Sequence, residues 1–151
     1  MKKADMANGL TKKTAIKPID IRFTIPLPPR TKKNHQEIRK NFKTGGRYIG
    51  QSDAYTRYEQ DCMWFVPANA RVRIETPVNI KALFFMDKDA KVDITNLHNA
   101  LHDILVGAGV LLDDSSLHPR IVAGTDKSRV FVDKENPRTE VTITSFKEEC
   151  E

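Results

Sequence analysis

The chain has 151 residues, of which 30% are charged and 39% hydrophobic, a composition typical of one globular domain rather than a disordered chain. No apolar run is long enough to span a bilayer, and no signal-peptide core follows the N-terminal lysines, which argues against a membrane or secreted protein. The two cysteines, Cys62 and Cys150, form neither a disulfide framework nor a zinc motif, so we expect a reducing, cytoplasmic compartment.

Positive charge is concentrated in the first third of the chain. The formal net charge is +5, yet residues 1–50 hold 13 Lys or Arg against 3 Asp or Glu, whereas the remainder holds 12 against 17. This division fits a phosphate-binding segment beside a metal-binding centre, although a solvated basic tail would look the same. We expect residues 1–20 to form a flexible basic arm, residues 21–146 the only domain, and residues 147–151 a tail.

The first predicted strand covers residues 21–27, where apolar and polar side chains alternate and Pro26 indicates a sheet edge or the end of the strand. Residues 28–50 follow, a basic segment interrupted by Pro28-Pro29 and Gly45-Gly46 that predicts a loop or loose hairpin. Lysine, arginine and asparagine side chains here suit phosphate contacts, which position DNA without reading its sequence. The candidate DNA contacts are Arg30, Lys32, Lys33, Asn34, Lys40 and Arg47.

The first predicted helix begins at Ser52, a preferred capping residue, and Pro67 ends it. Its apolar stripe consists of Tyr55, Tyr58, Cys62 and Phe65. Trp64 lies just off this stripe. We expect Trp64 in the core, because aromatic residues at helical spacing pack inside a protein more often than they stack on bases.

Residues 78–86 predict a central strand, since they are rich in β-prone residues and the second half is apolar on both faces. We expect a helix to cover at least one of these faces. A charged connection follows the strand, and it is either a solvated loop or a site where lysines balance acids near a phosphodiester. Lys88 and Lys91 are therefore further candidate DNA contacts.

Residues 91–114 predict a helix followed by a turn, with acidic residues at both ends of this helix–turn unit. The apolar residues of its stripe recur at helical spacing, and Gly107 and Gly109 end it. If the chain folds back after the glycines, Asp93, Asp113 and Asp114 converge on one divalent cation. The alternative is that Asp93 is only a helix cap and Asp113-Asp114 only a polar turn. The stripe consists of Leu97, Ala100, Leu101, Ile104, Leu105 and Ala108.

The same helix carries His98 and His102, four residues apart, a spacing at which two imidazoles can share a zinc ion. No glutamate follows in the arrangement of zinc proteases, and both residues lie on the polar flank of the predicted helix. We therefore expect exposed histidines. Asp103 is expected to be a surface acid of the helix.

The C-terminal third predicts further strands at residues 120–123 and 129–132 and at residues 138–146, where Val141 and Ile143 alternate with polar residues. A turn-forming segment separates the last two, so we expect an antiparallel hairpin. The whole pattern predicts an α/β (α+β) fold, in which two main helices pack on a mixed β-sheet.

The region from Met86-Asp87 to Asp114 resembles the RusA family of Holliday-junction resolvases. The likeness consists of an acidic residue, a short step to Asn96-Leu97, a helix, a glycine turn and Asp113-Asp114. It extends from about residue 21 to residue 146. The resemblance implies a small dimeric nuclease that uses magnesium, with manganese as a substitute, to cut four-way DNA junctions.

By position, the resemblance implies that Asp93 and Asp114 bind the metal and are catalytic, with Asp113 as a second ligand or support. The family pattern is Asp-x-Asp-Asn-Leu with a lysine a few residues later. This chain has Thr95 in place of the second acid and Asn99 in place of the lysine. Thr95 is then expected to orient Asp93 or a water on the metal, and Asn99 to contact DNA.

Three functions fit these features. The leading one is a magnesium-dependent endonuclease that resolves four-way junctions by paired incision, with branched DNA and a second copy of the chain as partners in a bacterial or phage setting. The second is a protein that binds DNA junctions or single strands with weak or no catalysis. The third is a basic nucleic-acid adaptor without a preference for branched DNA.

Overall fold

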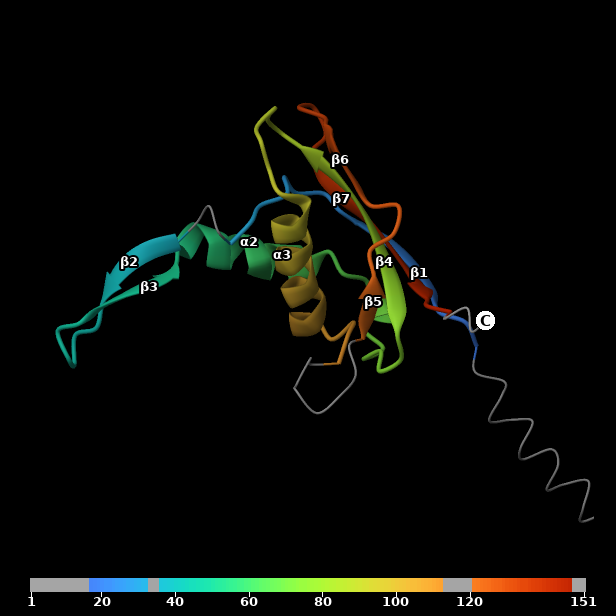
Figure 1. The fold of residues 1–151 in the computed structure, drawn as a ribbon, viewed down its shortest axis with the longest axis horizontal. Helices are drawn as coiled ribbons and strands as arrows, with labels where there is room; N and C mark the ends of the chain where they lie inside the picture. The colour runs from blue at the N-terminus through green and yellow to red at the C-terminus, as the bar shows by residue number, and fades with distance from the viewer. Residues whose placement is uncertain (1–16, 33–35, 113–120, 148–151) are drawn as a thin grey trace, which may run out of the picture.

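The computed structural model describes residues 17–32, 36–112 and 121–147, which form a mixed sheet, two α-helices on one face of that sheet, and a separate hairpin (Figure 1). This architecture confirms the predicted α+β fold. The elements in order are β1 (Asp20–Ile25), β2 (Gln36–Lys40), β3 (Arg47–Gln51), α2 (Asp53–Trp64), the short 3₁₀ helix η2 (Ala68–Ala70), β4 (Val78–Met86), α3 (Ile94–Gly107), β5 (Val122–Gly124), β6 (Arg129–Val132) and β7 (Arg138–Ser145).

β4 is the central strand of the sheet, as its sequence predicted. It pairs antiparallel with β7 on one side, and β7 pairs antiparallel with β1, which is an edge strand. On the other side β4 pairs in parallel with β5 near its start and with β6 near its end. Pro26 directly follows β1, which agrees with the predicted end of an edge strand.

The C-terminal strands do not form the predicted antiparallel hairpin. β6 and β7 lie on opposite sides of β4, and the connection between them passes the end of β4, where the Asp133 N–H donates to the Met86 carbonyl. A turn in the sequence shows that the chain reverses, but it does not show whether another strand lies between the two arms. Here β4 lies between the two strands, and it pairs with β6 along one edge and with β7 along the other.

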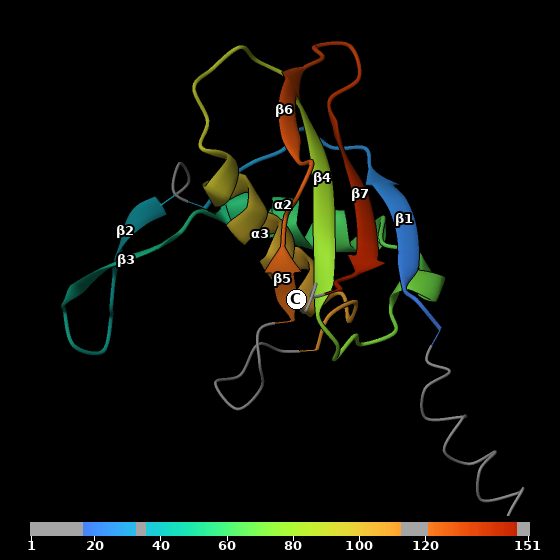
Figure 2. The same ribbon diagram turned by 45° about the vertical axis from the view of Figure 1, so that its right-hand side comes forward.

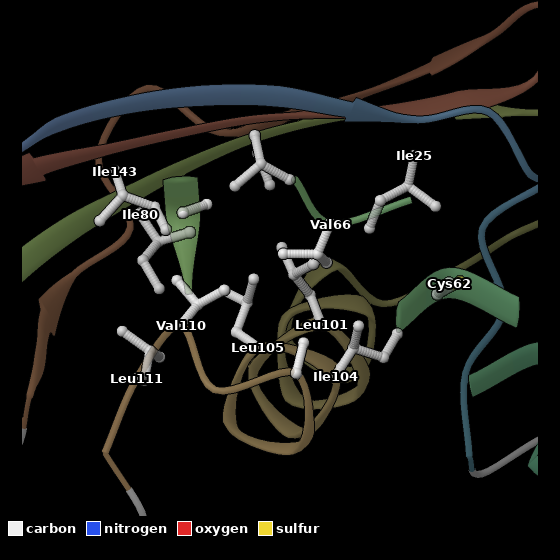
Figure 3. Close-up of a cluster of buried hydrophobic side chains, with 14 of the residues drawn as sticks. Ile25, Cys62, Val66, Ile80, Leu101, Ile104, Leu105, Val110, Leu111 and Ile143 are labelled. Carbon is white, nitrogen blue, oxygen red and sulfur yellow. The ribbon is translucent and has the colours of Figure 1, made fainter. Parts of the chain in front are cut away.

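The core lies between the sheet and the two helices (Figure 3). Every second residue of β4 is buried against the helices, and α3 meets this face with the apolar stripe that its sequence predicted. Cys62 of α2 is fully buried in the same cluster, as expected of a small apolar residue. The buried residues at the centre include Ile80, Phe84, Leu97, Leu101, Ile104 and Leu105.

Several predictions about burial are wrong. Phe65, the last residue of the stripe predicted for the first helix, is 44% exposed, because it follows α2 as its C-cap. Trp64, expected in the core, is 83% exposed, because it is the last residue of α2 and lies off the stripe that packs inward. His98, expected at the surface, is only 5% exposed. α3 turns a wider face toward the sheet than the apolar stripe alone suggests, and the His98 ring packs edge-on against Phe84 with ring centroids 5.2 Å apart.

This packing predicts the effect of two truncations. Leu105→Ala should lower the free energy of unfolding by about 2–5 kcal/mol, because it leaves a cavity between α3 and the sheet. Trp64→Ala removes a larger side chain from an exposed position and should change stability by less than about 1 kcal/mol. Urea denaturation followed by circular dichroism measures both. A larger loss for Trp64→Ala than for Leu105→Ala would contradict the packing described.

Candidate functional site

Asp93 is the N-cap of α3, which confirms the capping role that the sequence suggested. Its Oδ1 accepts a hydrogen bond of 2.8 Å from the Thr95 backbone N–H, and its backbone is extended, as in other N-cap residues. The residue is exposed, and its Oδ2 has no hydrogen-bond partner among the described residues. One carboxylate oxygen thus holds the helix end while the other stays available for a ligand.

The donor chemistry at this helix end fits a hard divalent cation. Magnesium is usually held by one or two carboxylates together with waters and substrate phosphates, and Asp93 supplies one such carboxylate beside the hydroxyl of Thr95. Within residues 17–32, 36–112 and 121–147, no group of three His, Cys, Asp or Glu side chains forms a complete metal site. Asp113 and Asp114 lie outside the described residues.

The chain leaves α3 at the end opposite Asp93 (Figure 1). The Val110 N–H donates to the Leu105 carbonyl, and the Leu112 N–H donates to the Ile74 carbonyl. Leu105 comes twelve residues after Asp93, about 18 Å along a helix axis. Asp113 and Asp114 follow outside the described residues, so the predicted convergence of the acids remains a prediction.

A groove lies beside Asp93, between the segment that follows β1 and the loop that follows β4. Its volume is about 390 Å³. Its lining includes three of the predicted DNA contacts, Arg30, Lys88 and Lys91. Val92 also lines it, and Asp93 is the next residue in the chain. Lys88 and Lys91 are exposed, so both ammonium groups can reach a phosphate that enters the groove.

Arg30 has a structural partner that the sequence analysis missed. Its Nη1 and Nη2 donate to the two carboxylate oxygens of Asp87, each at 2.9 Å. The hydrogen bonds to Asp87 raise the pKa of the Arg30 guanidinium, and in return they lower the pKa of the Asp87 carboxyl. The pair joins the chain after β1 to the end of β4. The only sequence signal was an acid directly after a buried strand, and the two partners are 57 positions apart in the chain.

The other predicted DNA contacts lie in different parts of the molecule. Lys32 forms an ion pair with Asp103 of α3, so Asp103 is the surface acid that the sequence predicted. Asn99 is exposed and lines a second groove of about 430 Å³ along α3. Lys40 and Arg47 lie opposite each other in the β2–β3 hairpin, which projects from the rest of the molecule (Figure 2), and neither lines the groove. Lys33 and Asn34 are outside the described residues.

His98, which is buried, and His102, which is half-buried rather than exposed as predicted, form a pair with ring centroids 5.5 Å apart. Neither His98 nitrogen, nor Nε2 of His102, has a hydrogen-bond partner in the described part of the chain. Burial lowers the pKa of His98 to about 4, with a further lowering by His102, and burial also lowers the pKa of His102. Both imidazoles are therefore neutral at pH 7, and they contribute to the packing of α3.

This pair predicts a pH-dependent stability. Unfolded His98 takes up a proton near pH 6.5, whereas folded His98 stays neutral down to about pH 4. The contribution of His98 to the free energy of unfolding is thus fully present above pH 6.5. It decreases as the pH falls, and at pH 5 the free energy of unfolding is lower by about 2 kcal/mol.

Urea denaturation at pH 7 and pH 5 tests the assignment. Between pH 7 and pH 5 the free energy of unfolding should fall markedly less in His98→Leu than in the wild type. His102→Leu should still show the part of the decrease that comes from protonation of His98. Equal losses in the wild type and His98→Leu would show that His98 is not the group responsible.

The sequence was compared with models of known protein families and with curated proteins. A family model described as endodeoxyribonuclease RusA matches residues 26–144, a span that includes every candidate site residue. No curated protein gives a significant match. No helix in the described part of the chain is long and apolar enough to cross a membrane. Because the match covers most of the 151 residues, the chain belongs to the RusA endodeoxyribonuclease family and is a nuclease of the kind that resolves Holliday junctions.

Proposed function

We propose that this nuclease is a magnesium-dependent, structure-specific enzyme that resolves four-way DNA junctions by paired incision. The observation that carries the proposal is Asp93 at the start of α3, with one carboxylate oxygen in the helix cap and the other without a partner among the described residues. The adjoining groove carries Lys88 and Lys91 at its surface. A carboxylate beside two lysines suits a site that takes both a cation and a phosphate.

In this proposal Asp93 and Asp114 hold the metal, and Asp113 is a second ligand or a support. When bound, magnesium, or manganese in its place, makes a water nucleophilic and stabilises the leaving oxygen. The chain itself positions the substrate. Lys88 and Lys91 hold the phosphate in the groove, and the Thr95 N–H keeps the Asp93 carboxylate in one orientation.

Thr95 changes the charge of the site relative to the family pattern. A hydroxyl replaces a carboxylate, so the site carries less negative charge and should bind magnesium more weakly. We therefore expect this enzyme to need more magnesium than a site with the full set of acids. The same substitution is the feature that favours the second candidate function, a junction-binding protein with weak catalysis.

The proposal includes a symmetric homodimer. A two-fold axis would place two copies of Asp93 on opposite strands of a junction, as paired incision requires. We also propose a cytoplasmic setting in a bacterium or phage-infected cell, and a division into a basic arm at residues 1–20, a nuclease domain at residues 21–146 and a tail at residues 147–151.

Asp93→Asn separates the catalytic role from the capping role. Asparagine caps a helix about as well as aspartate, so the free energy of unfolding should stay nearly unchanged. A neutral amide is a poor magnesium ligand, so cleavage of a synthetic four-way junction in magnesium should fall at least a hundredfold, on the order of losing a catalytic ligand. Junction binding should persist, because a negative charge near a phosphate has been removed.

Two further variants complete this test. Asp93→Ala should lose cleavage and also about 1 kcal/mol of stability, because it removes the cap. Thr95→Asp should lower the magnesium concentration that gives half-maximal cleavage. Full cleavage by Asp93→Asn would refute the catalytic assignment, and junction binding without cleavage by the wild type would favour the second candidate function.

Charge reversal in the hairpin tests the contribution of backbone contacts. Lys40→Glu and Arg47→Glu should weaken binding to every DNA sequence by a similar factor, and each should reduce the slope of log affinity against log salt by about 1. Lys127→Glu, which reverses an exposed charge in the loop before β6, is the matched control and should have little effect. Fluorescence anisotropy over a salt series measures the slopes, and unchanged slopes in the hairpin variants would exclude these contacts.

A further inference from the structure

The β2–β3 hairpin projects away from the sheet and the two helices (Figures 1 and 2). Within the described part of the chain its strands pair only with each other, and they form a two-stranded sheet separate from the main one. Such a ribbon is marginally stable in water unless something packs against it. Ile38 is nonetheless 75% exposed and Tyr48 52% exposed. The described part of the chain therefore leaves Ile38 and Tyr48 largely uncovered.

The tip of the hairpin presents a phenylalanine to solvent. Phe42 is 94% exposed, although phenylalanine is among the residues most often buried in proteins. The turn that carries it is held by its backbone, because the Asn41 N–H donates to the Gly46 carbonyl and the Gly45 N–H donates to the Asn41 carbonyl, each at 2.7 Å. Gly45 has a φ of +73°, which suits glycine. None of these bonds needs an aromatic ring at position 42.

The charges around the ring indicate the chemistry of its partner. Lys40 and Arg47 are directly opposite in the strand register, an arrangement of like charges that destabilises a hairpin standing alone. Lys43 adds a third exposed positive charge at the tip. None of the three forms an ion pair with a carboxylate among the described residues. A nucleic acid is a polyanion with flat apolar base surfaces. Its phosphates would pair with these charges, and its bases would stack on the ring.

We propose that Phe42 is a wedge that stacks on an end base pair at the branch point of the DNA, while Lys40, Lys43 and Arg47 hold the flanking phosphates. This inference rests on the proposed function, and it assigns to the hairpin the preference for branched over linear DNA. In a linear duplex the ring has to separate two stacked base pairs, which costs free energy at every step. At a branch point the stack is already interrupted, so the ring gains the stacking contact without that cost.

Binding to two DNA shapes tests the wedge. The affinity of the full chain for a four-way junction and for a linear duplex of the same sequence is measured in a chelator, which prevents cleavage. Phe42→Ala should weaken junction binding roughly five- to a hundredfold, the range found when a base-stacking aromatic is removed, and should change duplex binding less than about twofold. Phe42→Trp should restore the preference, whereas Phe42→Leu, which is apolar but not aromatic, should not.

Trp64→Ala is the matched control, because it removes an equally exposed aromatic ring from α2 and should leave both affinities unchanged. A 2-aminopurine placed at the branch point gives a direct readout. Its fluorescence should change on binding of the wild type and Phe42→Trp, but not on binding of Phe42→Ala.

Three results with Phe42→Ala would overturn the wedge. The first is an unaltered preference for junction over duplex, and the second is an equal loss of affinity for both. The third is that this variant is a monomer in sedimentation equilibrium where the wild type is a dimer, which would show that the ring docks on a second copy of the chain. Failure of the proposed function looks different, since the wild type would then leave junctions uncut in magnesium whatever Phe42 does in the chelator.

Discussion

The packing of α3 against β4 is the contact on which the rest of the structure depends. Both elements are apolar along the contact, and each buried leucine or isoleucine there contributes about 1.5–3 kcal/mol. The loop from Met86 to Asp93 is short, so the end of β4 and the start of α3 must lie near each other. That constraint gathers Asp87, Lys88, Lys91 and Asp93 at one end of the molecule without requiring any attraction among them.

Charged contacts then orient the chain that precedes the hairpin. Arg30 is held by Asp87 through two parallel hydrogen bonds, and Lys32 is held by Asp103. Partly exposed ion pairs of this kind add at most about 1 kcal/mol of stability, so their role is to fix direction. Among the predicted DNA contacts in the described part of the chain, Arg30 and Lys32 are engaged in this way, whereas the groove lysines Lys88 and Lys91 and the hairpin residues Lys40 and Arg47 have no ion pair with a carboxylate there.

This division gives the two ends of the protein different tasks. The groove beside Asp93 carries the residues suited to phosphodiester chemistry, and the hairpin carries exposed charge and an exposed ring that are suited to recognition. The groove is attached to the core through β4 and α3, whereas the hairpin has only its own two strands. A rigid centre and a projecting ribbon fit an enzyme whose substrate is defined by shape more than by sequence.

Most of the elements and the family could be recognised from the sequence, because helix caps, strand alternation and the apolar stripe of α3 depend on residues only a few positions apart. Ser52 and Asp93 cap their helices and Pro26 follows the edge strand, as local rules require. The position of Asp93 and the acids after the glycine turn were enough to indicate the RusA family, which the family match then showed.

The tertiary structure decided what distant residues do to one another. β4 separates β6 from β7, the sheet buries His98 although the sequence indicated the polar flank of the helix, and Asp87 binds Arg30, which lies 57 positions earlier in the chain. Trp64 is exposed because no element in the described part of the chain covers this side of the end of α2, and the residue type by itself does not show this. Each outcome depends on which surfaces meet after folding, and neither periodicity nor composition within one segment contains that information.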